Sequence, residues 1–467
     1  MPDIKPTTSL EEIVSLAKRR GFVYQTSEIY GGLANAYEYG PAGVEILRKI
    51  KNLWWDFFIS KREDMLGLDS QIILHPKTWE ASGHVGSFTD PMVEDKVSHK
   101  RYRADHLIEA WLAKNPINNP PSVESMKSEE MNRFLQENKV KSPDGNEISE
   151  VKNFNLLFES SIGVVADESS KVYLRGETAQ GIFSNFKQIL DSNRVKLPFG
   201  VGQVGKSFRN EITTGQFVFR TLEFEQAEIE YFFDPETSDW QALFNDWQEK
   251  MWYFVTEILG IDASRLRWRR HEDSERSFYS KDTYDLEYLY PFGWKELWGI
   301  AYRTDYDLKQ HMQFSGKNLE YTDPFTMKKF VPHVIEPAVG INRLFLMVLC
   351  DAFHQDESKN RLVLKLDQRL APYQLAVFPL LKNKEELVAK AREVFVNLSK
   401  KYRVAWDERG NIGKRYLSQD ELGTPYCVTI DFDTLEKGTV TIRRRDDASQ
   451  EIVELAELEQ KLALMLA

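Results

Sequence analysis

The chain has 467 residues, 42% of them hydrophobic and 12% aromatic, and its formal net charge is −11. This length and composition predict a globular protein of roughly two to three domains with sizeable cores. The acidic balance argues against indiscriminate nucleic-acid binding, and no run of about eighteen apolar residues predicts a membrane span. Because Cys350 and Cys427 are far apart without a C-x-x-C pattern, we expect no disulfide framework, no cysteine-zinc site and a cytoplasmic location.

The N-terminal part predicts two helices. Ser9 and Glu12 form a capping box that starts a helix ending near Arg20, with Gly21 as its stop. The glycine- and tyrosine-rich segment SEIYGGLANAYEYGPAG then leads into a second helix after Pro41. Its wide apolar face consists of Val44, Leu47, Ile50, Leu53, Trp54 and Phe57. The pattern alone fits a buried core helix and a helix covered by a second subunit equally well.

The next part contains His75 and His84, which lack metal-ligand spacing and are expected to be hydrogen-bonded structural residues. From about residue 115 to 153 the composition turns to Pro, Asn, Ser, Glu and Lys, which predicts an inserted, partly mobile subdomain. The fold is expected to resume afterwards. In YLRGETAQGIFSNF, Glu177 and Gln180 stand at the opening of a probable helix, where a carboxylate can cap the helix and complement its dipole.

The most informative stretch runs from residue 205 to 231 and predicts two strands joined by a polar loop around Thr213-Thr214-Gly215. Strand parity from Phe217 to Phe233 places Leu222, Phe224, Gln226 and Glu228 on one face and Glu223, Glu225, Ala227, Ile229 and Tyr231 on the other. A solvated hairpin is the simplest interpretation. However, Arg209 and Glu211 opposite the ring of Phe224 supply a cation for phosphate, an acceptor for an adenine amino group and a stacking surface. The stretch therefore predicts a purine-nucleotide site.

Two phosphate-binding patterns overlap the same stretch. Gly200, Gly205, Lys206 and Ser207 satisfy G-x-x-x-x-G-K-S, and Gly200, Gly202 and Gly205 satisfy G-x-G-x-x-G. Both motifs require a helix that opens at the last glycine, so that its N-terminal amides meet phosphate. The residues from Phe208 onward show strand and turn signals instead, and we reject both patterns.

Farther along, residues 239–258 predict a helix that stops at Gly260, and FVPHVIEPAVGINRLFLMVL predicts a strand, a sharp Pro-Gly bend and a helix with Arg343 in its first turn. After Lys365, short apolar strands alternate with helical stretches, which is typical of a small α/β domain. Residues 365–467 contain equal numbers of acidic and basic residues. Its local basic clusters, such as TIRRR, are suited to follow a phosphate backbone.

The stretch from residue 205 to 231 closely resembles motif 2 of the class II aminoacyl-tRNA synthetases, in the form found in the glycyl-tRNA synthetases. The helix after Pro41 resembles motif 1, and the segment containing Arg343 resembles motif 3. The resemblance covers nearly the whole chain apart from about 115–150. It implies an α+β catalytic domain with an antiparallel sheet over residues 1–364, with the insertion at about 115–153, and an α/β anticodon-binding domain over residues 365–467.

The resemblance also implies roles for individual residues. Arg209 and Arg343 are the expected catalytic residues, which hold the α-phosphate and the γ-phosphate end of a bent ATP, and Glu296 is the expected Mg²⁺ contact. The expected ATP site comprises Arg209, Asn210, Glu211, Phe219, Arg220, Phe224, Glu296, Leu297, Gly340, Asn342 and Arg343. The expected glycine site comprises Arg103, Glu177, Phe224, Glu225, Gln226, Glu228, Glu336, Ala338 and Gly340.

By this resemblance the protein activates glycine with ATP to glycyl-adenylate and transfers the glycyl group to the 3′ end of tRNA(Gly). It also implies a homodimer in which the helix around Trp54 and Trp55 is buried between subunits, without zinc and without a membrane. Four positions depart from the usual family residues, namely Gly176, Leu222, Ala338 and Asn342. The alternative is a catalytically inactive paralogue that binds nucleic acid as an accessory protein. The presence of both Arg209 and Arg343 argues against that alternative.

Overall fold

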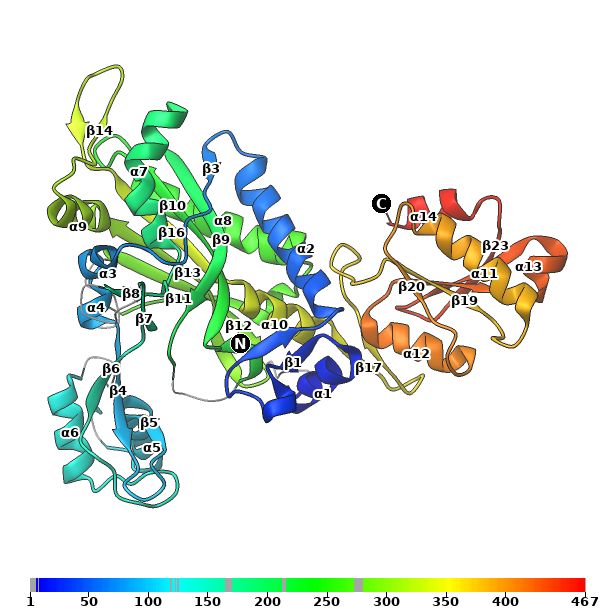
Figure 1. The fold of residues 1–467 in the computed structure, drawn as a ribbon, viewed down its shortest axis with the longest axis horizontal. Helices are drawn as coiled ribbons and strands as arrows, with labels where there is room; N and C mark the ends of the chain where they lie inside the picture. Colours follow the sequence, from blue (N-terminus) through cyan, green and yellow to red (C-terminus); the bar gives the residue numbers. More distant parts are fainter. Residues whose placement is uncertain are drawn as a thin grey trace.

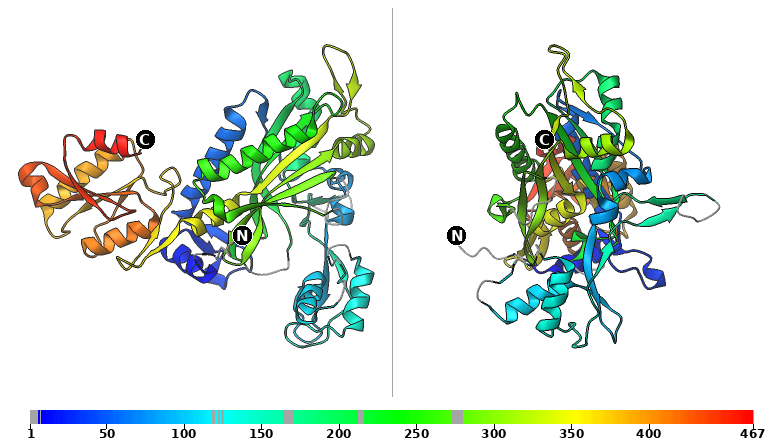
Figure 2. Two further views of the ribbon diagram at one scale, coloured as in Figure 1. Left: turned by 180° about the vertical axis from the view of Figure 1, so that it is seen from behind. Right: turned by 90° about the vertical axis from the view of Figure 1, so that its left-hand side faces the viewer.

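The computed structural model describes residues 6, 8–117, 120, 121, 123, 126–163, 170–211, 216–272 and 280–466. Figure 1 shows three units: a central body, a small module formed by residues 89–155, and a C-terminal unit. Each unit has its own hydrophobic core. Figure 2 shows that the C-terminal unit and the 89–155 module project from different sides of the central body. The expected turn at Thr213-Thr214-Gly215 lies outside the described residues.

A seven-stranded sheet forms the centre of the body, in the order β11-β12-β13-β16-β10-β9-β3. Its neighbouring strands run antiparallel except for β3, which pairs with β9 in parallel. The bounds are β3 Met65–Gly67, β9 Phe199–Phe208, β10 Glu223–Phe233, β11 Leu266–Arg270, β12 Asp282–Tyr290, β13 Gly293–Thr304 and β16 His333–Gly340. This arrangement confirms the expected α+β body with an antiparallel sheet.

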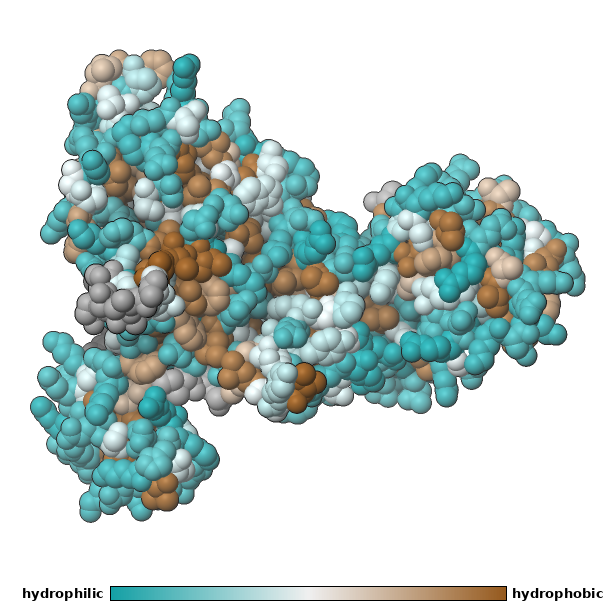
Figure 3. All heavy atoms as spheres, in the orientation of Figure 1, coloured by the Kyte–Doolittle hydropathy of each residue, from teal (hydrophilic) through white to brown (hydrophobic). Residues whose placement is uncertain are grey.

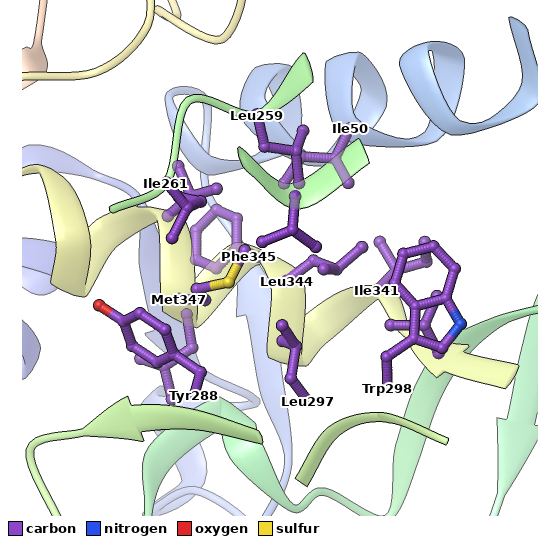
Figure 4. Packing of buried hydrophobic residues seen from close by; sticks show 14 of the residues in the cluster. Ile50, Leu259, Ile261, Tyr288, Leu297, Trp298, Ile341, Leu344, Phe345 and Met347 are labelled. Atoms are coloured by element: carbon purple, nitrogen blue, oxygen red, sulfur yellow. The ribbon is translucent and has the colours of Figure 1, made fainter. Parts of the chain in front are cut away.

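Helices bury one face of this sheet and part of the other. Apolar residues of α2 (Gly43–Trp55), α8 (Trp240–Tyr253) and α10 (Ile341–Ala352) share a core with the odd-numbered face of β10. Figure 4 shows Ile341, Leu344 and Phe345 of α10 packed among side chains that include Leu297 and Trp298 of β13. On the opposite face, α7 (Ala179–Asn193) and α9 (Tyr306–Ser315) pack over one end of the sheet. The rest of that face is available for a site.

The first helix follows its sequence signals closely. Helix α1 spans Leu10–Arg20, with the Ser9–Glu12 capping box at its start and Gly21 at φ 70° after its end. The expected helix from Asp239 is also confirmed, because Asp239 caps α8 and a π-helical turn, Phe254–Ile258, continues it to the stop before Gly260. These boundaries depend on hydrogen bonds between nearby residues, so the local sequence predicts them.

The aromatic helix α2 differs from the family-based expectation. Trp54 is fully buried within this chain, and Phe58 in the following π-helical turn, Asp56–Ser60, contacts the rings of Trp247 and Trp298 at centroid distances of 6.0 and 5.5 Å. The expectation that Trp54 is buried by a second subunit is therefore wrong. Helix α8 and strand β13, both far along the chain, supply the covering side chains.

The structure corrects two further local predictions for the body and confirms a third. Residues Phe217–Phe219 form a short 3₁₀ helix, so β10 begins only at Glu223. Gly205 lies inside β9 and no helix opens there, which confirms that neither phosphate-loop pattern applies. The predicted Pro-Gly bend is wrong, because β16 continues through Pro337 to Gly340. Pro337 is accommodated because the pairing with β10 has a gap there without a change of register, while β13 pairs with it.

The inserted module begins earlier than its composition suggested. Strands β4 (Thr89–Glu94), β5 (Arg101–Arg103) and β6 (Lys152–Asn155) form a three-stranded sheet with helices α5 (Ala104–Lys114) and α6 (Ser128–Glu137). Its core contains Val93, Ile108, Met131 and Leu135. The first half of the module has an ordinary apolar composition, so the polar, proline-rich composition marks only its second half.

The C-terminal unit is a five-stranded mixed sheet in the order β20-β19-β21-β22-β23, which confirms the expected α/β architecture. Its bounds are β19 Leu375–Pro379, β20 Val404–Trp406, β21 Tyr426–Ile430, β22 Thr439–Arg444, β23 Gln450–Glu454, α11 Glu385–Leu398, α12 Ile412–Leu422, α13 Phe432–Lys437 and α14 Leu458–Leu466. A hairpin of β17 (Phe353–Asp356) and β18 (Arg361–Leu364) precedes it and contacts α12.

Smaller elements complete the body: β1 Val23–Gln25, β2 Tyr37–Tyr39, β7 Glu159–Ser161, β8 Lys171–Tyr173, β14 Tyr321–Thr322, β15 Lys329–Phe330, α3 Pro76–Ala81 and α4 His84–Ser87. Figure 3 shows hydrophilic atoms over most of the C-terminal unit on this face, whereas apolar atoms gather on the central body. Within the described part of the chain, no helix has the length and apolar character needed to cross a membrane.

Candidate active site

A cavity of about 300 Å³ opens on the face of the sheet that α7 and α9 leave uncovered. Strands β10, β12, β13 and β16 contribute side chains to it, so residues far apart in sequence meet there. Its lining includes most residues expected from the sequence: Glu177, Arg209, Glu211, Phe219, Arg220, Phe224, Gln226, Glu228, Glu296, Glu336, Ala338, Gly340, Asn342 and Arg343. This volume is at the small end of the range for small-molecule sites.

Four expected site residues do not line the cavity. The side chain of Leu297 lies in the core beneath α10, and Glu225 on the other face of β10 forms an ion pair with Lys51 at 2.8 Å. Arg103 lies on β5 of the inserted module, where it pairs with Asp90 at 2.8 Å and Asp105 at 2.6 Å. Asn210 uses its backbone N–H to bond the carbonyl of Leu156 at 2.8 Å. Strand alternation explains the misplacement of Glu225, because neighbouring residues point to opposite faces.

The two expected catalytic arginines both line the cavity. Arg209 donates from Nε to the carbonyl oxygen of Gly176 at 3.0 Å, and its guanidinium lies 5.1 Å from the ring of Phe88 and 5.3 Å from that of Phe224. Arg343 contacts Oε2 of Glu296 at 3.0 Å and lies 4.4 Å over the ring of Phe219. Two positive charges therefore face a space lined by aromatic rings, as a nucleotide polyphosphate requires.

Two of the unusual residues have structural explanations. A Cβ on Gly176 would lie 3.1 Å from Leu157 and 3.3 Å from Phe88, so this glycine allows close packing beside Arg209. Asn342 accepts the N–H of Glu225 at 2.8 Å through Oδ1 and donates from Nδ2 to the hydroxyl of Tyr39. An amide can donate and accept at once, which an ionised aspartate cannot. Asn342 therefore ties the start of α10 to β10 and β2.

At the adenine end expected from the sequence, Glu211 forms an ion pair with Arg220 at 2.9 Å. Both residues line the cavity together with Phe219 and Phe224. The carboxylate of Glu211 is therefore held in place by a neighbouring cation while it faces the cavity. This arrangement places an acceptor beside a stacking surface, as the sequence predicted for a purine site.

The expected amine-binding carboxylates Glu177, Glu228 and Glu336 also line the cavity. Glu228 accepts hydrogen bonds from the N–H of Thr178 at 2.7 Å, from its hydroxyl, and from Nε2 of Gln226 at 2.7 Å. Glu177 accepts from Nε2 of Gln180 at 2.9 Å and lies 3.3 Å from Nε2 of His84. Each carboxylate is thus oriented by protein donors before any substrate arrives.

Sequence reasoning missed Arg303 as a site residue. Arg303 is buried at the end of β13, donates from Nη1 to Oε1 of Glu336 at 2.8 Å, and binds Asp307 through Nε and Nη2 at 2.8 Å each. The available signal was the period-two run Gly299, Ala301, Arg303, whose members all line the cavity. In the sequence, an arginine four residues before an aspartate resembles an ordinary surface ion pair, so the alternation alone does not identify Arg303 as a site residue.

Tertiary structure alone brings three further residues, His84, His271 and Asp285, to the site. His84 is hydrogen-bonded, as expected, with Ser82 Oγ at 2.8 Å from its Nδ1, but its other nitrogen meets Glu177 in the site. Asp285 lines the cavity beside His271, whose Nε2 lies 2.8 Å from Oδ2 of Asp285. Neither histidine has a sequence spacing that indicates these partners.

Burial and neighbouring charges give the three carboxylates different acidities. Burial raises the pKa of Glu228, and the nearby charge of Glu177 raises it further. Burial also raises the pKa of Glu336 to about 8, although Arg303 opposes the shift. For Glu177, burial opposes ionisation, but His84, Arg303 and Gln180 together lower its pKa. A cationic amine would compensate the concentrated negative charge of these carboxylates.

The donor set near Glu296 suits a magnesium ion bound together with substrate phosphates. A Cβ on Gly299 would lie 3.8 Å from Oε1 of Glu296 and 3.9 Å from Oδ1 of Asp285, so both carboxylates face the same small space. Within the described ranges, no group of three or more His, Cys, Asp or Glu side chains is arranged to hold a metal. Mg²⁺ commonly uses one or two carboxylates plus phosphate oxygens, and two protein ligands therefore fit it.

Comparisons with known proteins agree with this geometry. A family profile described as "Anticodon binding domain" matches residues 374–464, which is the C-terminal unit. The chain is 48% identical over 465 residues to a glycine–tRNA ligase of Clostridium acetobutylicum, covering 98% of this chain and 99% of that protein. It is 49% identical to a glycine–tRNA ligase of Mycoplasmopsis synoviae over 453 residues, covering 96% and 98% of the two chains. At this identity and coverage, the chain belongs to the glycine–tRNA ligases, also called glycyl-tRNA synthetases.

Proposed function

We propose that this protein activates glycine with ATP to form glycyl-adenylate and then transfers the glycyl group to the 3′-terminal ribose of tRNA(Gly). The observation that carries this proposal is that arginine and glutamate side chains line one cavity. Arg209 and Arg343 line the same cavity as the carboxylates Glu177, Glu228 and Glu336. A pair of substrates consisting of an anionic polyphosphate and a small cationic amine matches this distribution of charge.

In the first step, a carboxylate oxygen of glycine attacks the α-phosphorus of ATP, and the bond from that phosphorus to the bridging oxygen of pyrophosphate breaks. No protein nucleophile is needed, so catalysis consists of positioning and electrostatic stabilisation. Arg209 is assigned to the α-phosphate and Arg343 to the γ-phosphate end. Glu296 and Asp285 would hold Mg²⁺, which would supply positive charge that neutralises phosphate charge.

In the second step, the terminal ribose hydroxyl of the tRNA attacks the glycyl carbonyl carbon and AMP leaves. The C-terminal unit, which matches the anticodon-binding profile, is assigned to tRNA binding. Selection of glycine is a problem of exclusion, because the smallest amino acid offers no side chain to hold. We assign recognition of its ammonium group to the three carboxylates and rejection of larger amino acids to the packed walls around them.

ATP–pyrophosphate exchange measured with each of the twenty amino acids tests the proposal. Glycine should stimulate exchange and the other amino acids should not. Stimulation that is strongest with alanine or serine would overturn the proposed specificity. The alternative of an inactive accessory paralogue predicts no exchange with any amino acid.

Replacing Glu228 with glutamine should raise the KM for glycine by about ten- to a hundredfold. The substitution preserves shape but removes one negative charge from a buried site, and a charge-assisted hydrogen bond contributes roughly 1.5–3 kcal/mol. The KM for ATP should change much less, because the adenine and phosphate contacts are assigned to other residues. Steady-state exchange kinetics with each substrate varied in turn measure both values.

Glu225→Gln is the matched control for this experiment. It makes the same chemical change three residues away on β10, but on the face that points away from the cavity. Its glycine KM should stay close to that of the wild type. Equal losses for glycine and ATP in Glu228→Gln would instead assign Glu228 to support of the sheet or of the metal.

We further propose that the protein is a homodimer, with the loop around η1 (Glu28–Tyr30) at the interface in place of Trp54. Ile29 and Tyr30 are 87% and 86% exposed, and Leu33 beside them is 55% exposed. Neighbouring exposed apolar side chains of this size favour coverage by another protein surface. Their position in the segment that leads through β2 into α2, the helix that resembles motif 1, supports a second copy of this chain as the partner.

The double substitution of Ile29 and Tyr30 by aspartate should shift the protein from dimer to monomer in sedimentation experiments at micromolar concentration. Phe325→Asp is the matched control, because Phe325 is 77% exposed on the distant β14–β15 hairpin. The control should sediment as the wild type does. A monomeric wild type, or a double variant that remains dimeric, would contradict this interface.

A further inference from the structure

Glu230 is a buried carboxyl group that none of the roles assigned above uses. It lies on β10 two residues beyond Glu228, on the same face of the strand, and is fully buried. Neither of its carboxyl oxygens has a hydrogen-bond partner among the residues that the structure describes. Glu177 and Glu228 differ from it in this respect, because protein donors hold both of them.

The strand register places Glu230 beside Glu336. Strand β10 pairs Glu228 with Ala338 and Tyr231 with Ile335, so Glu230 and Glu336 stand at the intervening position where Pro337 interrupts the pairing. Side chains that are opposite each other on one face of neighbouring strands lie close together. Two carboxyl groups are thus adjacent in a buried site, and two like charges at that distance oppose each other.

The charged groups around Glu230 do not compensate a further negative charge. Glu336 approaches from β16, Arg303 from β13, Asp307 from α9 and Glu228 from the same strand. Arg303 is directed to Asp307 and Glu336, as the three contacts at 2.8 Å show. One guanidinium therefore stands among four carboxyl groups, and an isolated buried carboxylate without donors is strongly disfavoured.

We propose that Glu230 is a positioning residue that remains a neutral carboxylic acid beneath the ammonium-binding carboxylates, so that the negative charge of the site is confined to the groups that face the cavity. Burial and the adjacent Glu336 raise the pKa of Glu230 well above its ordinary value, in agreement with the geometry. Arg303 donates a hydrogen bond to Glu336, whereas Glu230 has no donor among the described residues, so Glu336 is the member of this coupled pair that ionises first. The consequence for glycine binding rests on the proposed function.

The substitution Glu230→Gln tests this inference, because an amide preserves the shape of a carboxylic acid and is neutral at every pH. The glycine KM of Glu230→Gln should stay within about threefold of the wild type at pH 7.5. Glu228→Gln, measured in parallel, should show the ten- to hundredfold increase expected above. A rise in Glu230→Gln as large as that in Glu228→Gln would overturn the inference, because it would show that Glu230 is an ionised ligand.

Thermal stability without substrates gives an independent result. A carboxyl group whose pKa is higher in the folded than in the unfolded state binds more protons when folded, so the free energy of unfolding falls as pH rises above the ordinary carboxyl pKa. Glu230→Gln lacks this loss. Its Tm minus that of the wild type should therefore increase from pH 6 to pH 9, and a difference that does not change with pH would overturn the inference.

A measurement on the wild type covers the case in which Glu230→Gln does not fold. The infrared carbonyl band of a protonated carboxylic acid should persist at pH 9, where Glu336, with a pKa of about 8, is mostly ionised. Complete absence of that band would overturn the inference. If Glu228→Gln leaves the glycine KM unchanged, the proposed amine site fails, whereas the stability and infrared results still decide the protonation of Glu230.

Discussion

Replacing Arg209 with alanine should lower glycine-dependent ATP–pyrophosphate exchange by about 10²–10³-fold, the range found when one preorganised donor is removed from a developing anionic centre. The guanidinium of Arg209 faces the cavity while Gly176 and two phenylalanine rings hold it in place. Its charge therefore needs little reorganisation when negative charge develops on the α-phosphate. The loss should appear mainly in kcat, because the interaction is strongest in the transition state.

Lys206→Ala provides the matched control for Arg209→Ala. Lys206 is a cation on β9, three residues before Arg209, but it pairs with Glu223 at 2.8 Å outside the cavity. Its removal should leave exchange nearly unchanged. The folding of Arg209→Ala is checked by thermal unfolding, since the substitution also removes contacts to Phe88 and Phe224. Similar losses in both variants would show that the cavity is not the site of adenylate formation.

Replacing Asp420 with alanine should destabilise the protein by about 3–5 kcal/mol, the cost of breaking a buried ion pair from one side. Asp420 is fully buried on α12 and contacts Arg443 through both guanidinium nitrogens at 2.8 Å. It also accepts from Arg361 of β18 at 2.9 Å. Removing this one carboxylate leaves two buried guanidinium groups without their shared partner, and one of them belongs to the hairpin that joins the C-terminal unit to the body.

Urea unfolding of Asp420→Ala and of the wild type, followed by circular dichroism, measures this effect. Asp433→Ala is the control, because Asp433 forms an exposed pair with Lys437 at 3.1 Å and such pairs contribute little. Every proposed ATP and glycine contact precedes Lys365. Pyrophosphate exchange by Asp420→Ala should therefore survive conditions that abolish tRNA charging, and simultaneous loss of both activities would contradict this separation of roles.

The buried charge network around Arg303 explains why part of the site was invisible in the sequence. Phe224, Gln226 and Glu228 were assigned to one face by strand parity, and the structure confirms that all three line the cavity. Arg303, however, acquires its role from Glu336, which lies thirty-three residues farther along the chain. A pairing at that separation leaves no periodic pattern, because it depends on the order of strands in the sheet.

The sequence by itself determined the features that depend on nearby residues: the capped start and glycine stop of α1, the alternation of β10, and the side-chain chemistry of Arg209, Glu211 and Arg343. These follow from local hydrogen bonds and from the fixed geometry of helices and strands. Tertiary structure alone decided that Trp54 is buried in the core of this chain, that Leu297 faces away from the cavity, and that His84 contacts Glu177. Those outcomes depend on which distant surfaces come together, because burial and long-range ion pairs are properties of the packed chain and not of its local pattern.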